Sequence, residues 1–212
     1  MANKYLPITL SLQNRACLVV GGGTVALRKV DTLLDYECDV TVIATEPHDK
    51  IEYYAEKKSI KLEKRAYKSP EAAAYGMVIS ATDDHELNKQ VYDDCNGAGV
   101  LVNVVDNPPL CNFIFPAVVK RDALTVAVST DGKAPFLSGQ LRLILENVFP
   151  EHWNKIIKLA AKFRKMVQER WPEEPEQRAL CFEAFIEADW KTMIKEMSDA
   201  QVDDELVRLL VP

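Results

Sequence analysis

The sequence has few cysteines and histidines, and neither residue type is spaced like a metal or disulfide site. It holds five cysteines and three histidines among 212 residues. The cysteines are odd in number and widely spaced, they form no Cys-x-x-Cys pair, and the histidines have no second ligand at helical spacing. We therefore predict no metal-binding residues. We interpret as small buried hydrophobic side chains Cys17, Cys38, Cys95, Cys111 and Cys181.

A long apolar run and an excess of positive charge are also missing. The longest mostly apolar runs, such as Val100–Val105, are too short to span a bilayer, so we expect no membrane segment. Met1–Leu10 lacks a basic stretch followed by an apolar core, and we expect a cytoplasmic protein. The net charge of −6 argues against nucleic-acid binding, but it is compatible with an anionic small substrate held by local lysines and arginines.

The first half of the chain alternates strand-like and helix-like segments. Apolar or alternating runs predict strands at 16–20, 40–44, 60–67, 77–81 and 100–105. Helices are expected between them at 24–36, 46–58 and 84–96, the last capped by the pair Asp83 and Asp84. Strands separated by helices of crossover length imply a parallel sheet with right-handed connections. The sequence therefore predicts an α/β fold with an N-terminal Rossmann sheet.

The pattern changes after Pro108-Pro109. Two apolar stretches, 113–119 and 124–129, are separated only by 120–122 and predict a pair of antiparallel strands. A two-stranded unit is marginal by itself, so we expect a second chain to complete it. Beyond Pro135 the pattern is helical. The predicted parts are an NAD-binding Rossmann domain at 1–113, a small dimerisation region at 114–148 and a helical C-terminal domain at 149–212.

A glycine-rich turn carries the strongest functional signal. Gly21-Gly22-Gly23-Thr24-Val25-Ala26 fits the pattern G-x-G-x-x-[GA] directly after the first strand and at the start of a helix. The first glycine allows the tight turn, the second glycine of the pattern allows a pyrophosphate to approach, and Ala26 allows helix and strand to pack closely. The helix N-terminus supplies N–H groups to the phosphates. The alternative is a glycine turn without a ligand.

The end of the second predicted strand bears on the choice of cofactor. An acidic residue is expected there to hold the adenosine ribose, and the strand ends in Ile43-Ala44-Thr45-Glu46. Glu46 lies slightly far along the chain, and backbone groups at Thr45 are an alternative. No arginine or lysine follows closely to bind a 2′-phosphate, so NAD is favoured over NADP.

Four motifs follow one another in the order and spacing of a known family: Gly21–Gly23, Ser80–Asp84, Asn103–Asp106 and Ser129–Pro135. The similarity runs over essentially all 212 residues and includes Cys111–Ala117 and Arg142. In these motifs the chain resembles the precorrin-2 dehydrogenase and sirohydrochlorin ferrochelatase family. Its members occur as stand-alone enzymes and as the N-terminal module of fused siroheme synthases.

The resemblance implies an activity and an assembly. It implies NAD-dependent oxidation of precorrin-2 to sirohydrochlorin in siroheme biosynthesis and, in some members, insertion of Fe²⁺ as a second substrate to give siroheme. It also implies a homodimer. We expect no methyltransferase step, because the sequence leaves no room for the methyltransferase domain of the fused enzymes.

Site residues follow from the same resemblance by position. Gly22, Gly23, Thr24 and Val25 are expected under the cofactor, with Gly21 at the turn, and we also expect contacts from Thr45, Glu46 and Thr82. Asp106 matches an acidic residue that some members use in both activities. By itself, a strand-end aspartate is equally typical of a turn and of a ligand site, and the resemblance favours a catalytic base.

A substrate with many carboxylates needs cations and free N–H groups. Gly132 allows an anion-binding nest, and Lys133 and Arg142 are the favoured cations, Arg142 foremost, whereas Lys120 and Arg121 fit solvated charges in a hairpin turn. Ser129 and Thr130 either bind the substrate or shape the turn. Two residues depart from the family, which leaves substrate contacts there open: Thr130 stands where fused enzymes can carry serine, and Ala134 replaces a common serine.

Two other classes of function remain open. An NAD-sensing regulatory module without catalysis would account for Gly21–Ala26, but it gives no role to Asp106 or to the loop at 129–135. A helical C-terminal region that binds other proteins is the third possibility. An assay with NAD⁺ and precorrin-2 separates these three classes.

Overall fold

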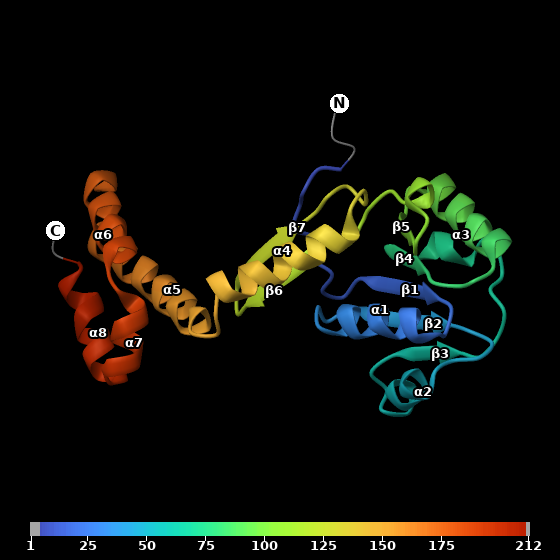
Figure 1. The fold of residues 1–212 in the computed structure, drawn as a ribbon, viewed down its shortest axis with the longest axis horizontal. Helices are drawn as coiled ribbons and strands as arrows, with labels where there is room; N and C mark the ends of the chain where they lie inside the picture. Colours follow the sequence, from blue (N-terminus) through green and yellow to red (C-terminus); the bar gives the residue numbers. More distant parts are fainter. Residues whose placement is uncertain (1–4, 211–212) are drawn as a thin grey trace. The chain divides into compact units, whose positions relative to one another are not determined.

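The computed structural model describes residues 5–210, and the chain divides into two compact units, Met1–Phe115 and Pro116–Pro212 (Figure 1). The first unit holds a parallel sheet with its helices. The second holds a small antiparallel sheet and a set of helices. This content confirms the predicted fold class, while the division into three parts stays a prediction.

The first unit is a five-stranded sheet in the order β3-β2-β1-β4-β5, with every pairing parallel. Its strands are β1 (Ala16–Val20), β2 (Asp39–Ile43), β3 (Lys61–Glu63), β4 (Met77–Ser80) and β5 (Leu101–Val104). Its helices are α1 (Thr24–Leu34), α2 (Asp49–Glu56), the short 3₁₀ turn η1 (Glu71–Ala74), α3 (His85–Ala98) and a second 3₁₀ turn, η2 (Pro108–Leu110). The order reverses beside β1, which places a ligand crevice at the carboxyl ends of these strands.

The sheet is buried on both faces because successive side chains of a strand point to opposite sides. On β1, Cys17 and Val19 lie in a core with residues of α1 and α2, whereas Leu18 and Val20 lie in a second core with residues of α3. All four side chains are at most 2% exposed. A strand covered on both sides reads as a continuous apolar run, which is why the sequence made β1 easy to predict.

Helix boundaries in this unit follow local capping. The aspartate pair was expected to cap α3, and Asp84 does so by accepting hydrogen bonds from the N–H groups of Glu86 and Leu87, both at 3.0 Å. The helix expected at 46–58 begins only at Asp49, because His48 caps it through Nδ1 and stands in extended backbone. The strand expected at 60–67 is also shorter than predicted and ends at Glu63.

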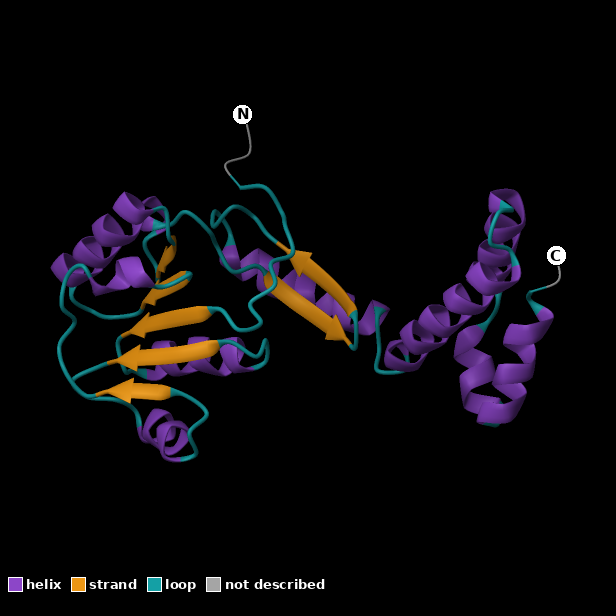
Figure 2. Ribbon diagram, turned by 180° about the vertical axis from the view of Figure 1, so that it is seen from behind, coloured by secondary structure: helices purple, strands orange, loops and turns teal. Residues whose placement is uncertain are grey.

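The second unit begins with a two-stranded antiparallel sheet formed by β6 (Ala117–Arg121) and β7 (Leu124–Val128). The predicted antiparallel pairing is therefore confirmed. Helix α4 (Pro135–Val148) contacts both strands and follows them in the chain (Figure 2). Ser138 is the buried residue of α4, so this helix turns a small polar side chain toward its covered side.

The limits of the first of these strands differ from the prediction. A strand was expected at 113–119, yet β6 begins only after Pro116, whose nitrogen has no hydrogen to donate to a ladder. Lys120 and Arg121 were interpreted as charges in the turn, but both are paired within the strands. Arg121 Nε also donates to the carbonyl of Phe149 at 2.6 Å, which makes this arginine a structural residue.

The rest of the second unit is helical, as predicted. It consists of α5 (Trp153–Arg170), α6 (Pro175–Glu187), α7 (Trp190–Glu196) and α8 (Asp199–Arg208). Ile156, Phe163 and Val167 recur at helical spacing along α5, and all three lie in its core cluster. No helix between residues 5 and 210 is long and apolar enough to cross a membrane.

Candidate functional site

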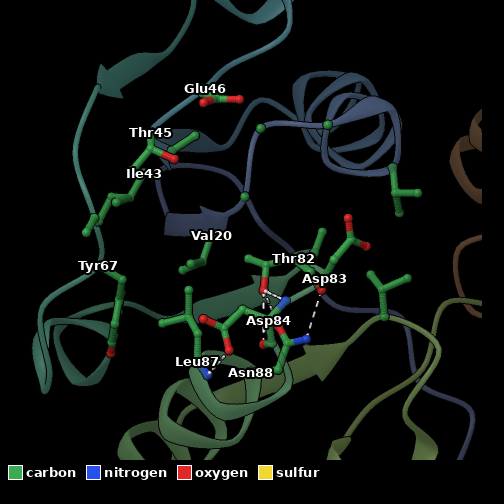
Figure 3. Close-up of a pocket in the computed structure, with 18 of the residues that line it drawn as sticks. Val20, Ile43, Thr45, Glu46, Tyr67, Thr82, Asp83, Asp84, Leu87 and Asn88 are labelled. Atoms are coloured by element: carbon green, nitrogen blue, oxygen red, sulfur yellow. Dashed lines mark hydrogen bonds between the residues drawn. The ribbon is translucent and has the colours of Figure 1, made fainter.

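A cavity of about 800 Å³ opens at the carboxyl ends of four parallel strands in the first unit (Figure 3). Val20 ends β1, Ile43 ends β2, Ala81 follows β4 and Val105 follows β5, and all four line the cavity. This is the edge at which open α/β sheets bind their ligands. The side chains that line it decide which ligand it fits.

The glycine turn forms one wall of the cavity, and its first two glycines are required by the chain itself. Gly21 has a φ of +113°, and a Cβ there would lie 2.2 Å from the carbonyl oxygen of Ala81. A Cβ on Gly22 would lie 2.6 Å from the carbonyl oxygen of Glu46. Both positions therefore exclude any side chain. The sequence predicted this for the tight turn at Gly21, whereas the requirement at Gly22 comes from the approach of Glu46.

Gly23 differs, because a Cβ at this position would meet no atom of the described chain within 4 Å. Its φ is −75°, so the backbone does not demand glycine either. Gly23 is also the N-cap of α1, and its position provides no side chain to bind the first N–H groups of the helix. An anion can approach the backbone closely at such a position, because no side chain blocks it and the first N–H groups of the helix have no side-chain cap.

The opposite wall comes from the segment after β4. Thr82 lines the cavity, and its hydroxyl donates to Oδ1 of Asn88 at 3.1 Å. Asn88, on α3, is only 5% exposed; its Oδ1 also accepts from Ser80 Oγ at 2.6 Å, and its Nδ2 donates to the Thr82 carbonyl at 2.9 Å (Figure 3). These bonds hold the Thr82 segment against α3. Sequence reasoning overlooked Asn88, although a polar residue among the buried positions of α3 was a signal.

The end of β2 contributes the two residues that were predicted to hold the adenosine. Thr45 and Glu46 both line the cavity and are exposed. Glu46 lies close enough to the turn that its carbonyl would contact a Cβ on Gly22. The backbone of this segment therefore lies against the glycine turn, and the exposed side chain of Glu46 contributes to the cavity lining.

Asp106 lines the same cavity from the end of β5. Its φ of +56° places it in the left-handed region, which aspartate tolerates better than most residues. Lys29 on α1 lies nearby: burial lowers its pKa, the charge of Arg28 lowers it further, and the charge of Asp106 opposes both effects. The ammonium of Lys29 lies 4.1 Å from the centroid of the Phe115 ring. Asp106 is thus both a turn residue and a cavity residue.

A third wall, from the segment after β3, was not anticipated. Arg65, Ala66 and Tyr67 all line the cavity. Tyr67 is 9% exposed and donates from its hydroxyl to Asp94 at 2.6 Å; burial, with this bond, raises its pKa. No arginine or lysine directly follows β2, but the parallel sheet brings Arg65 to the cavity from the end of its edge strand β3.

The loop predicted to face the substrate belongs to the second unit. The hydroxyl of Ser129 accepts from the N–H of Asp131 at 3.2 Å, and Thr130 Oγ1 accepts from the N–H of Ala134 at 3.1 Å. Gly132 has a φ of +74°. The two hydroxyls therefore shape the turn, one of the alternatives that the sequence left open.

The cations predicted beside that loop have different surroundings. Lys133 is exposed, and Arg142 forms an ion pair with Glu146 one turn along α4. Their role toward a ligand in the first unit stays a prediction. All the residues predicted for the cofactor and for catalysis line the one cavity: Gly21, Gly22, Gly23, Thr24, Val25, Thr45, Glu46, Thr82 and Asp106.

The cysteines take no part in that lining. All five are buried, as expected, and within residues 5–210 no disulfide joins any two of them. Burial raises the pKa of Cys17 and of Cys95 to about 12, so both remain neutral thiols at neutral pH. Among residues 5–210, no three side chains of the metal-binding types are grouped as a metal site.

Comparison with known proteins decides the family. Residues 8–117 match the model of a family described as putative NAD(P)-binding, and this match spans the glycine turn, the Thr82 segment and Asp106. The chain belongs to this NAD(P)-binding family. The membership confirms the predicted NAD-type cofactor.

Curated relatives of this NAD(P)-binding chain carry the name siroheme synthase. The protein of Nitrosococcus oceani is 41% identical over 167 residues, 79% of this chain and 36% of the relative. That of Methylococcus capsulatus is 40% identical over 86% of this chain and 38% of the relative. The chain thus spans less than half the length of these relatives, and the resemblance found in its motifs is confirmed.

A solved structure shares the fold. It is titled "SirC, precorrin-2 dehydrogenase", has a TM-score of 0.77 and covers 97% of this chain and 98% of its own. The sequence identity is 22%, so this likeness bears on the fold alone. It confirms the predicted succession of Rossmann sheet, small antiparallel sheet and helical region.

Proposed function

We propose that the protein is an NAD-dependent dehydrogenase that oxidises precorrin-2 to sirohydrochlorin in siroheme biosynthesis. The observation that carries this proposal is the cavity in which a dinucleotide-binding turn and the carboxylate of Asp106 lie together. The names of the siroheme synthase relatives and of the structural neighbour support the choice of substrate. A regulatory NAD sensor would need the glycine turn but not a carboxylate in the cavity.

The residues present fit the dinucleotide. Gly23 leaves space that nothing in the described chain fills, and α1 begins there without a side-chain cap. The N–H groups of the first turn, at Thr24 and Val25, would hold the pyrophosphate. Thr45 and Glu46 would hold the ribose at the adenosine end. When bound, NAD⁺ supplies the acceptor for a hydride.

Asp106 would take the proton that accompanies hydride loss. Oxidation of precorrin-2 removes two hydrogens, one as a hydride that leaves with the cofactor and one as a proton. The presence of the Asp106 carboxylate in the cavity lining, at the carboxyl end of β5, supports that role. The left-handed backbone would fix the direction in which the Asp106 side chain leaves the turn, and the positive charge of Lys29 on α1, which interacts with that of Asp106, would favour this placement.

The decisive experiment mixes the purified protein with NAD⁺ and precorrin-2. A dehydrogenase produces NADH absorbance and the spectrum of sirohydrochlorin in equal amounts, at a rate proportional to protein concentration. A sensor module binds NAD⁺ and leaves the pigment unchanged. NAD⁺ binding without turnover would therefore replace the proposed dehydrogenase with the regulatory alternative.

Insertion of Fe²⁺ into sirohydrochlorin is a second candidate activity, and the same carboxylate favours it. Metal insertion displaces two pyrrole protons, so a base already placed for the oxidation can serve this step as well. We expect the protein to accelerate Co²⁺ or Fe²⁺ insertion and Asp106→Ala to lose both activities together. A rate equal to that without protein would remove chelation and leave the dehydrogenase standing.

A homodimer is proposed from the surface of α4. Leu137, Leu141, Ile144 and Val148 are 37–55% exposed and follow one another at spacings of four, three and four residues. Such spacing places apolar side chains along one seam of a helix, as in helices that pack together. Phe136, at 81%, and Leu143, at 45%, widen this apolar face. We propose that a second copy of the chain covers it, which is consistent with the small size of the β6–β7 sheet.

A further inference from the structure

Arg65 lies at the cavity with its guanidinium held between two carboxylates. Its Nε donates to Glu63 Oε2 at 2.9 Å, and Nη2 contacts the same oxygen. Nη1 and Nη2 donate to the two oxygens of Glu71 at 2.8 and 2.6 Å. Nη1 also donates to the carbonyl of Ala66 at 3.0 Å. These five hydrogen bonds equal the number of N–H donors on a guanidinium.

The two carboxylates are themselves fixed. Glu63 accepts a salt bridge from Lys61 at 2.6 Å, and Glu71 accepts the N–H of Lys68 at 2.5 Å. The bond from Lys61 and then that from Arg65 lower the pKa of Glu63, and the bonds from Arg65 lower that of Glu71. Both stay ionised at neutral pH, so the arginine is held in a permanent clamp.

A clamped arginine offers a ligand its flat face rather than its edge. The edge, which carries the N–H groups, is occupied, yet the side chain is 32% exposed and lines the cavity. Among residues 5–210, aromatic rings contact cations such as Lys29, Lys50 and Arg170, and none of these contacts involves Arg65. The faces of a guanidinium stack well on planar rings, and no ring within the described residues occupies those of Arg65.

The wall that holds Arg65 also holds Tyr67, and the end of β2 lines the same cavity with Thr45 and Glu46. The adenosine half of the cofactor is expected at that end, by the proposed function on which this step rests. We propose that Arg65 is a residue of the adenine subsite, where the clamped guanidinium stacks on the adenine ring and donates no hydrogen bond to the cofactor.

The same clamp would favour NAD over NADP, as the sequence predicts. An arginine near the adenosine ribose normally recognises a 2′-phosphate through its N–H groups. The donors of Arg65 are already used by Glu63 and Glu71, and the carboxylate of Glu46 at the end of β2 would repel a phosphate. The site therefore contains a cation that does not attract NADP⁺.

The first experiment removes the flat face. The dissociation constants of AMP, NAD⁺ and nicotinamide mononucleotide are measured calorimetrically or by competition for the wild type, Arg65→Met and Arg65→Lys. We expect both variants to weaken AMP and NAD⁺ about fivefold and to leave nicotinamide mononucleotide unchanged, because lysine keeps the charge without the plane. Lys64→Met is the control, since Lys64 pairs with Glu52 at 2.6 Å and lies outside the lining.

The second experiment frees one N–H donor of Arg65 from its bond to Glu71. In Glu71→Gln one carboxylate oxygen becomes an amide nitrogen that cannot accept, so one N–H of Arg65 is freed. We expect the affinity for NADP⁺ to rise about threefold or more relative to that for NAD⁺, while circular dichroism stays that of the wild type. An unchanged ratio of the NADP⁺ and NAD⁺ affinities in Glu71→Gln would show that the clamp does not govern the choice between the two cofactors.

Failure of this inference differs from failure of the proposed function. A wild-type protein that binds no NAD⁺ would overturn the function itself. A wild type that binds NAD⁺, with Arg65→Met and Arg65→Lys that bind AMP equally well, would overturn only the role of Arg65. Equal weakening of AMP and nicotinamide mononucleotide would also contradict it, since that result indicates general damage to the cavity.

Discussion

The parallel sheet of the first unit and the antiparallel sheet of the second satisfy their apolar surfaces in different ways. The five-stranded sheet has two cores, one on each face, and its own helices supply both. The two-stranded sheet packs with α4, and that helix leaves six large apolar side chains exposed. The first unit can thus hold a ligand site on a sheet that is already covered on both faces. The second unit has an exposed apolar surface suited to association with another protein chain.

The difference extends to the kind of residue that carries function. In the first unit, backbone geometry at Gly21 and Gly22 and a left-handed Asp106 shape the cavity. In the second unit, the backbone of α4 is a regular helix, and its exposed apolar side chains from Leu137 to Val148 give the surface its character. Rigid sheet ends therefore suit a cofactor, and a helix face suits a partner.

The largest effect is expected from Gly23→Asp. The new side chain would fill the space left for the pyrophosphate and add negative charge at the helix N-terminus, so NAD⁺ binding should be lost while the fold remains. Calorimetry measures the binding, and circular dichroism the fold. Gly97→Asp is the control, because Gly97 also has an open Cβ position but lies outside the cavity. NAD⁺ affinity equal to that of the wild type would remove the glycine turn from the site.

The next largest effect is expected from Asp106→Asn. Its kcat should fall about 100-fold, because a general base usually contributes a factor of this size. Asparagine tolerates the left-handed backbone as aspartate does, so the substitution removes the charge and keeps the turn. The dissociation constant of NAD⁺ should not change. Asp122→Asn, at another position of positive φ, is the control. Undiminished kcat would leave Asp106 with a structural role only.

Leu141→Glu tests the proposed dimer face. Burial of an unpaired carboxylate in an apolar contact is costly, so the dimer dissociation constant should rise at least about tenfold. Sedimentation velocity over a range of concentrations measures it. Leu180→Glu alters a leucine of similar exposure, 47% against 37%, on α6 and should leave the assembly unchanged. A wild type that sediments as a monomer at every concentration would contradict the proposal.

The smallest expected effect is a difference in stability between the two units, which the alkylation of their buried cysteines in urea would measure. Cys17 and Cys95 lie in the large double core, and Cys181 lies in the smaller cluster of α5–α8. A smaller core is less stable, so Cys181 should be alkylated at a lower urea concentration. Mass spectrometry at pH 8 identifies the labelled residues, and the raised pKa of Cys17 and Cys95 suppresses reaction in the folded state. Simultaneous labelling would show that the units unfold together.

The sequence was a reliable guide wherever a local pattern had one structural solution. The apolar run of β1, the glycine turn after it and the Asp84 cap of α3 were all predicted and are all present. It was less reliable where packing decided. Phe113 and Phe115 look like strand residues, but they pack on the core of the first unit, and the strand begins after Pro116.

By itself, the sequence determined the fold class, the dinucleotide turn and the family, since these depend on residue type and spacing along the chain. Only the tertiary structure placed Arg65 and Tyr67 in the cavity beside Thr45, and Asn88 behind Thr82. Those residues come from segments after different strands, and a parallel sheet gathers all its carboxyl ends at one edge. Such neighbours are distant in the chain, so no local pattern could reveal that the donors of Arg65 are already occupied.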